Sequence, residues 1–264
     1  MTGLPADQRD RYSRSLLMEW FTAADQRRLL NASVAVVGAG GLGSASSAYL
    51  VAAGIGTVGI VDAGTVSRSN LQRQVLYGAD DIGRPKATRA ANRLEALNET
   101  VTIEPIRERV TQSNAPDLLK PFDIVVDGLD TIRTRLTVNE TTRALDIPFV
   151  HGAVYGFEGQ LAVFRPGGPC YRCLVPSPPR VDEDGEEDPI GVFPPVPGII
   201  GCMQAVEVIK LCLATGRVLD DRLRRYDAMA VQWIETPLES RSTCPVCAPD
   251  ATETPRSDDP GGRS

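Results

Sequence analysis

Four of the six cysteines form two close pairs, Cys170 with Cys173 and Cys244 with Cys247. Each CxxC pair can bind one metal ion through both thiolates, and two pairs complete the tetrahedral shell that holds structural zinc. Four thiolates leave no coordination position for water, so we expect Zn²⁺ to fix the C-terminal segment without taking part in a reaction. Redox-active pairs are the alternative, but the chain would need two thioredoxin-type motifs, each at a helix start after a strand.

A second group of residues has the spacing of a nucleotide site. Gly38, Gly40 and Gly43, with Gly41 between them, form GxGxxG between an apolar run and an alanine-rich stretch. Glycine lets the backbone turn tightly and approach a phosphate, and the helix that follows offers free N–H groups. Asp62 ends the second apolar run, where its carboxylate can accept hydrogen bonds from ribose hydroxyls. These residues alone do not distinguish NAD, FAD, S-adenosylmethionine and ATP, and a glycine turn without a ligand is a further alternative.

The polar stretch after Asp62 narrows the choice of ligand. It carries Asn70, Arg73 and Lys86 and shows little apolar periodicity. In a dehydrogenase a helix usually follows the second strand at once. Two cations beside a phosphate-binding turn suit a triphosphate, whose negative charge must be neutralised. Taken singly, Arg73 and Lys86 would be solvated surface charges, but their common position after the turn favours a site for ATP.

These residues must be positioned by an alternation of strands and helices. Apolar runs predict strands over 33–37, 57–62, 101–106, 123–130 and 148–156. Helical stretches separate them over 44–54, 84–97 and 131–145. The alternation favours a doubly wound, Rossmann-like α/β fold with a mostly parallel sheet. Antiparallel strands over 157–166, 222–229 and 230–238 are expected to extend the sheet, with a helix over 198–214 between them.

One domain, residues 1–247, accounts for all of these elements. Residues 1–31 predict two short helices, 177–197 a flexible crossover loop rich in Pro, Asp and Glu, and 248–264 a disordered tail. The formal net charge of −6 argues against a sequence-independent grip on nucleic acid. No segment approaches the roughly 18 unbroken apolar residues of a membrane span. The N-terminus has no secretion signal, so we expect a cytoplasmic protein without membrane contact.

The order of the motifs resembles a known family. GAGGLG, Asp62, SNLQRQ, GRPKA and DGLDT follow one another as in the ThiF/MoeB/HesA family of ubiquitin-activating-enzyme-like adenylyltransferases, closest in pattern to the MoeB type. The match runs from Arg11 to about Cys247, and SNLQRQ with GRPKA is its most distinctive part. The resemblance implies ATP-dependent adenylation of the C-terminal carboxylate of a small ubiquitin-like sulfur-carrier protein that ends in Gly-Gly, with release of pyrophosphate.

The resemblance also implies roles for individual residues. Asp62 would hold the ribose, Asn70, Arg73 and Lys86 would contact the phosphates, and Asp130 would bind Mg²⁺. A carboxylate at the C-terminal end of a parallel strand lies where such sheets bind ligands, which fits Asp130. Asp is also a good N-cap, so capping of the helix that follows is the alternative role for Asp130.

Arg14 matches an arginine that in this family reaches the ATP site of the neighbouring subunit. The resemblance therefore implies a homodimer, with Arg14, Arg73, Lys86 and Asp130 as the catalytic residues. No general base is needed, because a carboxylate is already ionised at neutral pH. The chain shows no appended sulfurtransferase domain, so we expect a separate sulfur donor protein. Molybdopterin synthesis, thiamin synthesis, tRNA thiolation and protein conjugation all use this activation step.

Three residues stand apart from the family pattern or outside the expected reaction. Thr131 replaces an Asn that many relatives carry after the metal-binding Asp, so one contact could be weakened. The crossover loop holds no cysteine that could form a covalent intermediate. We expect Cys202 to be a buried helix residue. The sequence therefore predicts adenylation without a catalytic cysteine. His151, the single histidine, is expected to be a core or crevice residue with a satisfied ring.

Two other functions remain open at this point. An NAD(P)-dependent oxidoreductase would explain GAGGLG and Asp62, but it leaves SNLQRQ, GRPKA and the paired CxxC motifs without roles. A non-catalytic relative that binds a ubiquitin-like partner is favoured by Thr131 alone, whereas Arg73, Lys86 and Asp130 together oppose it.

Overall fold

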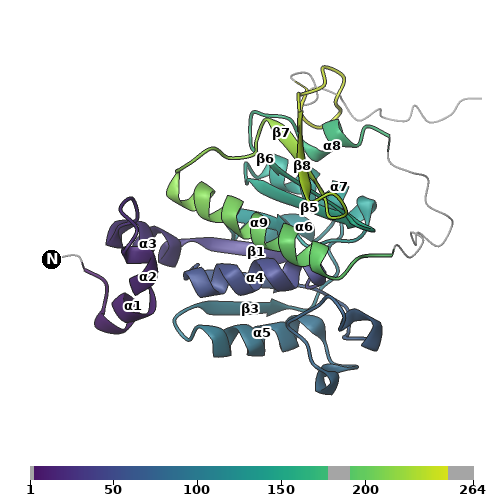
Figure 1. The fold of residues 1–264 in the computed structure, drawn as a ribbon. Helices are drawn as coiled ribbons and strands as arrows, with labels where there is room; N and C mark the ends of the chain where they lie inside the picture. Colours follow the sequence, from purple (N-terminus) through teal and green to yellow (C-terminus); the bar gives the residue numbers. More distant parts are fainter. Residues whose placement is uncertain (1–2, 178–190, 249–264) are drawn as a thin grey trace, which may run out of the picture.

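The computed structural model describes residues 3–177 and 191–248, and one eight-stranded sheet runs through them (Figure 1). The strand order is β3-β2-β1-β4-β5-β6-β7-β8. The strands are β1 (Ser33–Val37), β2 (Thr57–Val61), β3 (Thr102–Ile106), β4 (Ile124–Asp127), β5 (Phe149–Tyr155), β6 (Glu158–Phe164), β7 (Arg222–Asp227) and β8 (Gln232–Pro237). The α-helices are α1 (Ala6–Arg11), α2 (Ser13–Leu16), α3 (Ala23–Asn31), α4 (Gly41–Ala53), α5 (Lys86–Leu97), α6 (Ala115–Leu119), α7 (Ile132–Ala144), α8 (Tyr171–Leu174) and α9 (Pro195–Leu213).

Strands β1 to β5 are parallel, and helices cover both faces of this half of the sheet. Val34 and Val36 face a core built with α4, α5 and α9, whereas Ala35 and Val37 face a second core built with α6 and α7. Strands buried on both faces read as continuous apolar runs, which is why the sequence shows them so clearly. The structure confirms the doubly wound, Rossmann-like prediction.

Strands β6, β7 and β8 are antiparallel and extend the sheet beyond β5, as predicted. Every residue of β8 is exposed, since it forms the sheet edge. Helix α9 lies between β6 and β7 in the chain, and it packs against α4, β5 and β6. Among the described residues α9 is the one helix long and apolar enough to cross a membrane by length and composition, and half of that stretch is buried inside the fold.

The boundaries differ from the prediction at three places. Three short helices replace the two expected before residue 31, because buried Tyr12 interrupts the first helical stretch and anchors it to Asn98. Part of the expected crossover loop is ordered: Val192 bridges to Gly156, and α9 already begins at Pro195, a residue type suited to the first turn of a helix. Residues 178–190 of that loop and 249–264 of the expected tail lie outside the described residues.

Candidate nucleotide site and cysteine cluster

The strand order reverses between β1 and β4, so the carboxyl ends of these two strands border the crevice where open α/β sheets bind ligands. Gly38 follows β1 with a φ of 96°, a left-handed conformation that favours glycine. Gly128 follows β4, and its N–H donates to the carbonyl oxygen of Val37 at 2.8 Å. A Cβ on Gly38 would overlap the carbonyl of Gly128, so the two turns approach as closely as glycine allows.

The remaining glycines of the motif have different tasks. A Cβ on Gly43 would overlap the carbonyl oxygen of Gly38, and one on Gly41 would lie 2.8 Å from Cβ of Pro197 in α9. Both therefore permit close packing of the protein on itself. At Gly40 the nearest atom to such a Cβ is 3.7 Å away. A Cβ there would make ordinary van der Waals contacts, so packing of the protein on itself does not require glycine at Gly40, the N-cap of α4.

Asp62 ties the turn after β2 to the glycine turn. Its two carboxylate oxygens accept hydrogen bonds from the N–H of Ala39 (2.8 Å) and of Gly64 (2.7 Å). Lys86 begins α5, and its N–H donates to the carbonyl of Gly64 at 2.9 Å. The Lys86 ammonium also lies beside Gly64, 3.8 Å from the position that a Cβ there would take. The fold thus brings Asp62 and Lys86 together with the glycine turn.

Asn70 and Arg73 lie in the polar stretch that includes the 3₁₀ helix η1 (Arg68–Asn70). The Asn70 side chain accepts from the N–H of Ser67 at 3.2 Å and so holds this turn. Arg73 donates to the carbonyl of Ser69 at 3.1 Å, and its Cγ lies 3.4 Å from the Cβ position of Gly41. The stem of Arg73 therefore lies against the start of α4, at the same end as Gly40.

Tyr77 is a member of the site that the sequence analysis missed. Its buried hydroxyl donates to the carbonyl of Ala39 at 2.9 Å and so fixes the glycine turn. Burial raises the pKa of Tyr77 well above its ordinary value, with the nearby Asp62 carboxylate acting in the same direction, so the hydroxyl remains a donor. The sequence feature that indicates Tyr77 is an aromatic residue between the two polar motifs SNLQRQ and GRPKA.

Asp130 is exposed, three residues beyond the end of β4. Thr131 occupies the N-cap position of α7, and no side-chain hydrogen bond caps that helix. The alternative role of Asp130 as a helix cap is therefore wrong. Within the described residues its carboxylate has no hydrogen bond or ion pair. Thr131 instead hydrogen-bonds Thr134 through the side chains at 2.9 Å.

A buried network that the sequence analysis did not predict lies directly beneath this loop. Oδ2 of Asp127 accepts from Nε of Arg135 (2.6 Å) and from Nδ1 of His151 (2.7 Å). Oδ1 accepts from the N–H of Leu129 (3.0 Å), and Gln204 donates to the Asp127 carbonyl (2.8 Å). All five residues are largely buried or lie in the loop, so the network fixes the backbone that leads to Asp130.

The charges in this network are balanced. Burial alone would raise the pKa of Asp127, but the Arg135 guanidinium and the hydrogen bond from His151 hold it below its ordinary value. Burial lowers the pKa of His151, so the imidazole is neutral and its Nδ1–H donates to Asp127. The other ring nitrogen, Nε2, is buried without a hydrogen-bond partner among the described residues. His151 is thus a core residue, as predicted, but only half of its ring is satisfied.

Arg14 lies away from the glycine turn of its own chain. It is exposed on α2, which follows Tyr12, and Tyr12 contacts Gly54 at the C-terminal end of α4. The glycine turn is at the other end of this helix, which has 13 residues and is therefore about 20 Å long. The structure accordingly separates Arg14 from the other predicted catalytic residues within one chain.

The two cysteine pairs meet in space. The four Sγ atoms of Cys170, Cys173, Cys244 and Cys247 lie within 4.8 Å of one another, with 3.6 Å between Cys170 and Cys244 and 3.3 Å between Cys173 and Cys247. A tetrahedral zinc with bonds of about 2.3 Å needs about 3.8 Å between sulfurs, so the residues fit this ion. The N–H of Arg241 donates to Sγ of Cys173 at 3.4 Å, as expected for a thiolate ligand.

Backbone N–H groups favour the charged form of one ligand. Burial opposes ionisation of Cys244, but hydrogen bonds from the N–H groups of Val246 and Cys247 lower its pKa to about 7. Cys202 lies on α9 outside this cluster and is half-buried, not fully buried as predicted. Burial raises the pKa of the Cys202 thiol, which makes it a poor nucleophile.

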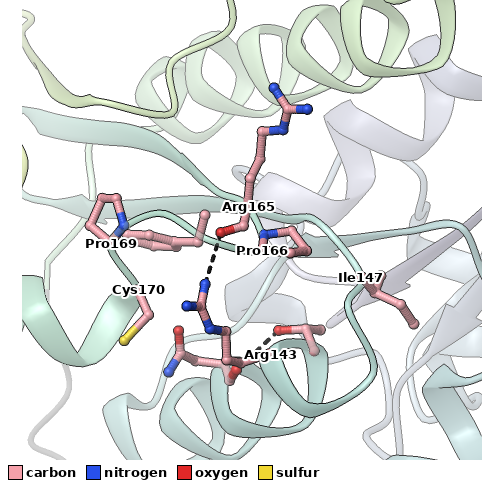
Figure 2. Close-up of a pocket in the computed structure, with 9 residues that line it drawn as sticks. Arg143, Ile147, Arg165, Pro166, Pro169 and Cys170 are labelled. Carbon is pink, nitrogen blue, oxygen red and sulfur yellow. Dashed lines mark hydrogen bonds between the residues drawn. The ribbon is translucent and has the colours of Figure 1, made fainter. Parts of the chain in front are cut away.

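A small pocket lies between the end of α7 and the loop before Cys170 (Figure 2). Arg143 spans it and donates to the carbonyl oxygens of Arg165 (3.0 Å) and Gly168 (3.2 Å). The described residues that line it include none of the predicted nucleotide ligands. Its contacts instead fix the loop before the cysteine cluster to α7.

The order of these sites along the chain matches a known family. The profile described as the ThiF family matches residues 12–246. The chain belongs to the ThiF family. It is 46% identical over 244 residues to the SAMP-activating enzyme E1 of Haloferax volcanii, covering 92% of this chain and 90% of that enzyme. It is 42% identical over 253 residues to the sulfur carrier protein adenylyltransferase of Thermus thermophilus, covering 94% and 93%.

Other ThiF-family relatives are longer than this chain. The adenylyltransferase and sulfurtransferase MOCS3 of Arabidopsis thaliana is 40% identical over 252 residues, and the match covers 95% of this chain but 54% of that protein. Among solved structures, E. coli MccB with ATP superposes with a TM-score of 0.80 at 22% identity, covering 92% of this chain and 76% of that chain. At this identity the likeness concerns the fold alone.

Proposed function

We propose that this protein adenylates the C-terminal carboxylate of a small ubiquitin-like sulfur carrier that ends in Gly-Gly. The observation that carries the proposal is the assembly at the carboxyl ends of β1 and β4: a glycine turn at the start of α4, Asp62 bonded to that turn, Lys86 beside Gly64, and Asp130 exposed after β4. The named ThiF-family relatives are adenylyltransferases and an E1-type activating enzyme, which supports the same reaction. None of them is named as an oxidoreductase.

In the proposed reaction a carrier carboxylate oxygen bonds to the α-phosphorus of ATP, and the bond from that phosphorus to the oxygen bridging to the β-phosphate breaks. Pyrophosphate leaves and an acyl-adenylate remains. Arg73 and Lys86 neutralise charge on the phosphates, Asn70 contacts them, and Asp62 holds the ribose. Mg²⁺ bound by Asp130 would supply further neutralisation of phosphate charge. The protein otherwise contributes positioning, since the attacking carboxylate is already ionised.

We also propose that Arg14 completes the site of a second copy. Arg14 is too far from its own glycine turn to contact a nucleotide there. Helices α4 and α9 pack side by side and expose Tyr49 (58%) and Val206 (46%), and the region around α2 exposes Leu17 and Trp20. An apolar face of this kind supports a homodimer. If two copies meet through α4 in opposite directions, α2 of one copy comes to the glycine end of the other.

The carrier would dock on the antiparallel half of the sheet. Phe157 and Phe193 stack with ring centroids 4.5 Å apart and are each about two-fifths exposed, and β8 presents Trp233 and Ile234. Exposed apolar groups of this density mark protein-binding surfaces. We propose a cytoplasmic enzyme that uses zinc only for structure, forms no covalent intermediate through Cys202, and relies on a separate sulfur donor.

ATP–pyrophosphate exchange tests the proposed function directly. The assay uses a carrier that ends in Gly-Gly, the same carrier without its last glycine, and the variants Asp130→Ala and Asp117→Ala. Asp117 is an exposed carboxylate on α6 and serves as the matched control. Exchange that needs the complete carrier and is lost only in Asp130→Ala supports adenylation. ATP binding without exchange for any carrier would favour a non-catalytic binding protein, the function that Thr131 suggests.

A further inference from the structure

Tyr171 lies between the cysteine cluster and the nucleotide site. It stands between Cys170 and Cys173 at the start of α8 and is 3% exposed. Its N–H donates to the side-chain oxygen of Asn139 on α7 at 2.7 Å. Tyr171 therefore lies within the CxxC pair, next to the ligand Cys170 and two residues before Cys173, so the position of its ring depends on the backbone that carries both ligands.

The Tyr171 ring contacts both partners of the Asp127 carboxylate. Its centroid is 5.0 Å from that of the His151 ring and 5.6 Å from Cζ of Arg135, which stacks over it. A guanidinium over a tyrosine face is attracted by the ring quadrupole, most strongly when both are shielded from water. Phe164 supports the ring from the side, with centroids 6.0 Å apart in an edge-on arrangement.

Arg135 and His151 in turn hold the loop that ends in Asp130. Both side chains donate to Oδ2 of Asp127, and Nη2 of Arg135 donates to the carbonyl of Leu129 at 2.6 Å. Leu129 is the residue immediately before Asp130. A continuous series of contacts thus joins the cysteine cluster to the backbone that carries the proposed Mg²⁺ ligand.

We propose that Tyr171 is a positioning residue that couples the occupied cysteine cluster to the Asp130 loop. The part of this inference that concerns Mg²⁺ rests on the proposed function. Zinc in the cluster would fix α8, α8 fixes the Tyr171 ring, and the ring restricts Arg135 and His151 to the conformations that hold the loop. The zinc site would then do more than pin the C-terminal segment.

The single histidine of the chain is a reporter at the centre of this network. Untagged protein labelled with ¹⁵N-histidine gives the NMR signals of His151 alone. We expect zinc removal by a chelator to shift these signals in the native protein. In Tyr171→Leu the signals should already be shifted and should not respond to zinc removal. Signals that ignore zinc in the native protein, or that still respond to zinc in Tyr171→Leu, would overturn the coupling.

The second measurement is the Mg²⁺ dependence of binding of a fluorescent, non-hydrolysable ATP analogue. Tyr171→Leu should raise the Mg²⁺ concentration for half-maximal binding about tenfold, the effect of losing a contact of cation–π strength. Arg172→Ala, which changes the neighbouring residue of the same CxxC pair, should stay near the native value. An unchanged Mg²⁺ dependence in Tyr171→Leu would contradict a positioning role. Loss of zinc from the Tyr171→Leu protein would contradict it as well, because the residue would then act by holding the cysteine cluster together. If the native protein binds no analogue with Mg²⁺, the proposed function fails, whereas the histidine spectrum still decides the coupling.

Discussion

Gly40→Ala tests whether the space beside the glycine turn receives a phosphate. A Cβ at this position meets the Gly128 carbonyl oxygen at 3.7 Å and the Gln74 side chain at 3.8 Å, both ordinary van der Waals distances. Gly40 has φ −80° and is the N-cap of α4, so alanine fits its backbone. We therefore expect the free energy of unfolding to fall by about 1 kcal/mol or less, the usual scale of a change at an N-cap.

Nucleotide binding should respond much more strongly to the same methyl group. A phosphate oxygen must come within about 2.9 Å of a backbone N–H to accept a charge-assisted hydrogen bond, and the methyl occupies the approach. One such bond is worth about 1.5–3 kcal/mol. The dissociation constant for ATP with Mg²⁺ should then rise by about 10- to 150-fold.

The assay pairs calorimetric titration of a non-hydrolysable ATP analogue with urea unfolding. Gly168→Ala is the control, because a Cβ there also has its nearest atom at 3.6 Å but lies far from the glycine turn. Gly43→Ala should differ in stability, because its Cβ overlaps the Gly38 carbonyl, and the free energy of unfolding should fall by about 3 kcal/mol. Native affinity in a folded Gly40→Ala protein would refute the phosphate assignment.

Three further outcomes are expected. When Arg14→Ala and Asp130→Ala chains are mixed in equal amounts, dissociated and reassociated, half of the dimers hold one complete site. The mixture should therefore restore about a quarter of native pyrophosphate exchange. No recovery would mean that Arg14 acts within its own chain or not at all. Below the ordinary histidine pKa of 6.5, His151 takes up a proton in the unfolded chain, whereas burial opposes this protonation in the folded state. The free energy of unfolding should therefore decrease as the pH falls below 6.5. His151→Asn should flatten this decrease between pH 6.5 and 5.5, as measured by urea unfolding. Cys244→Ser should reduce bound zinc from one per chain and lower the melting temperature, whereas Cys202→Ser should keep both zinc and exchange, as measured by metal analysis, calorimetry and the exchange assay.

The sequence predicted the elements because their signals are local. Strands β1, β2 and β4 are buried on both faces and therefore appear as unbroken apolar runs. Short helices such as α6 and α8 have too few residues to show a period, and neither was predicted. The cysteine cluster was predictable because the spacing within each pair is set by a few residues of backbone.

Tertiary structure alone decided which acidic residue of the DGLD segment is buried and which is exposed. Asp127 and Asp130 are three residues apart, yet Asp127 is 0% exposed and paired with groups 8 and 24 residues away, whereas Asp130 is exposed. The same holds for Arg14, which the fold places at the far end of α4 from the glycine turn. Residue type and local spacing determine backbone conformation and ligand chemistry. The burial and the partners of a charge depend on distant segments that meet only when the sheet assembles, and these set its pKa and its role.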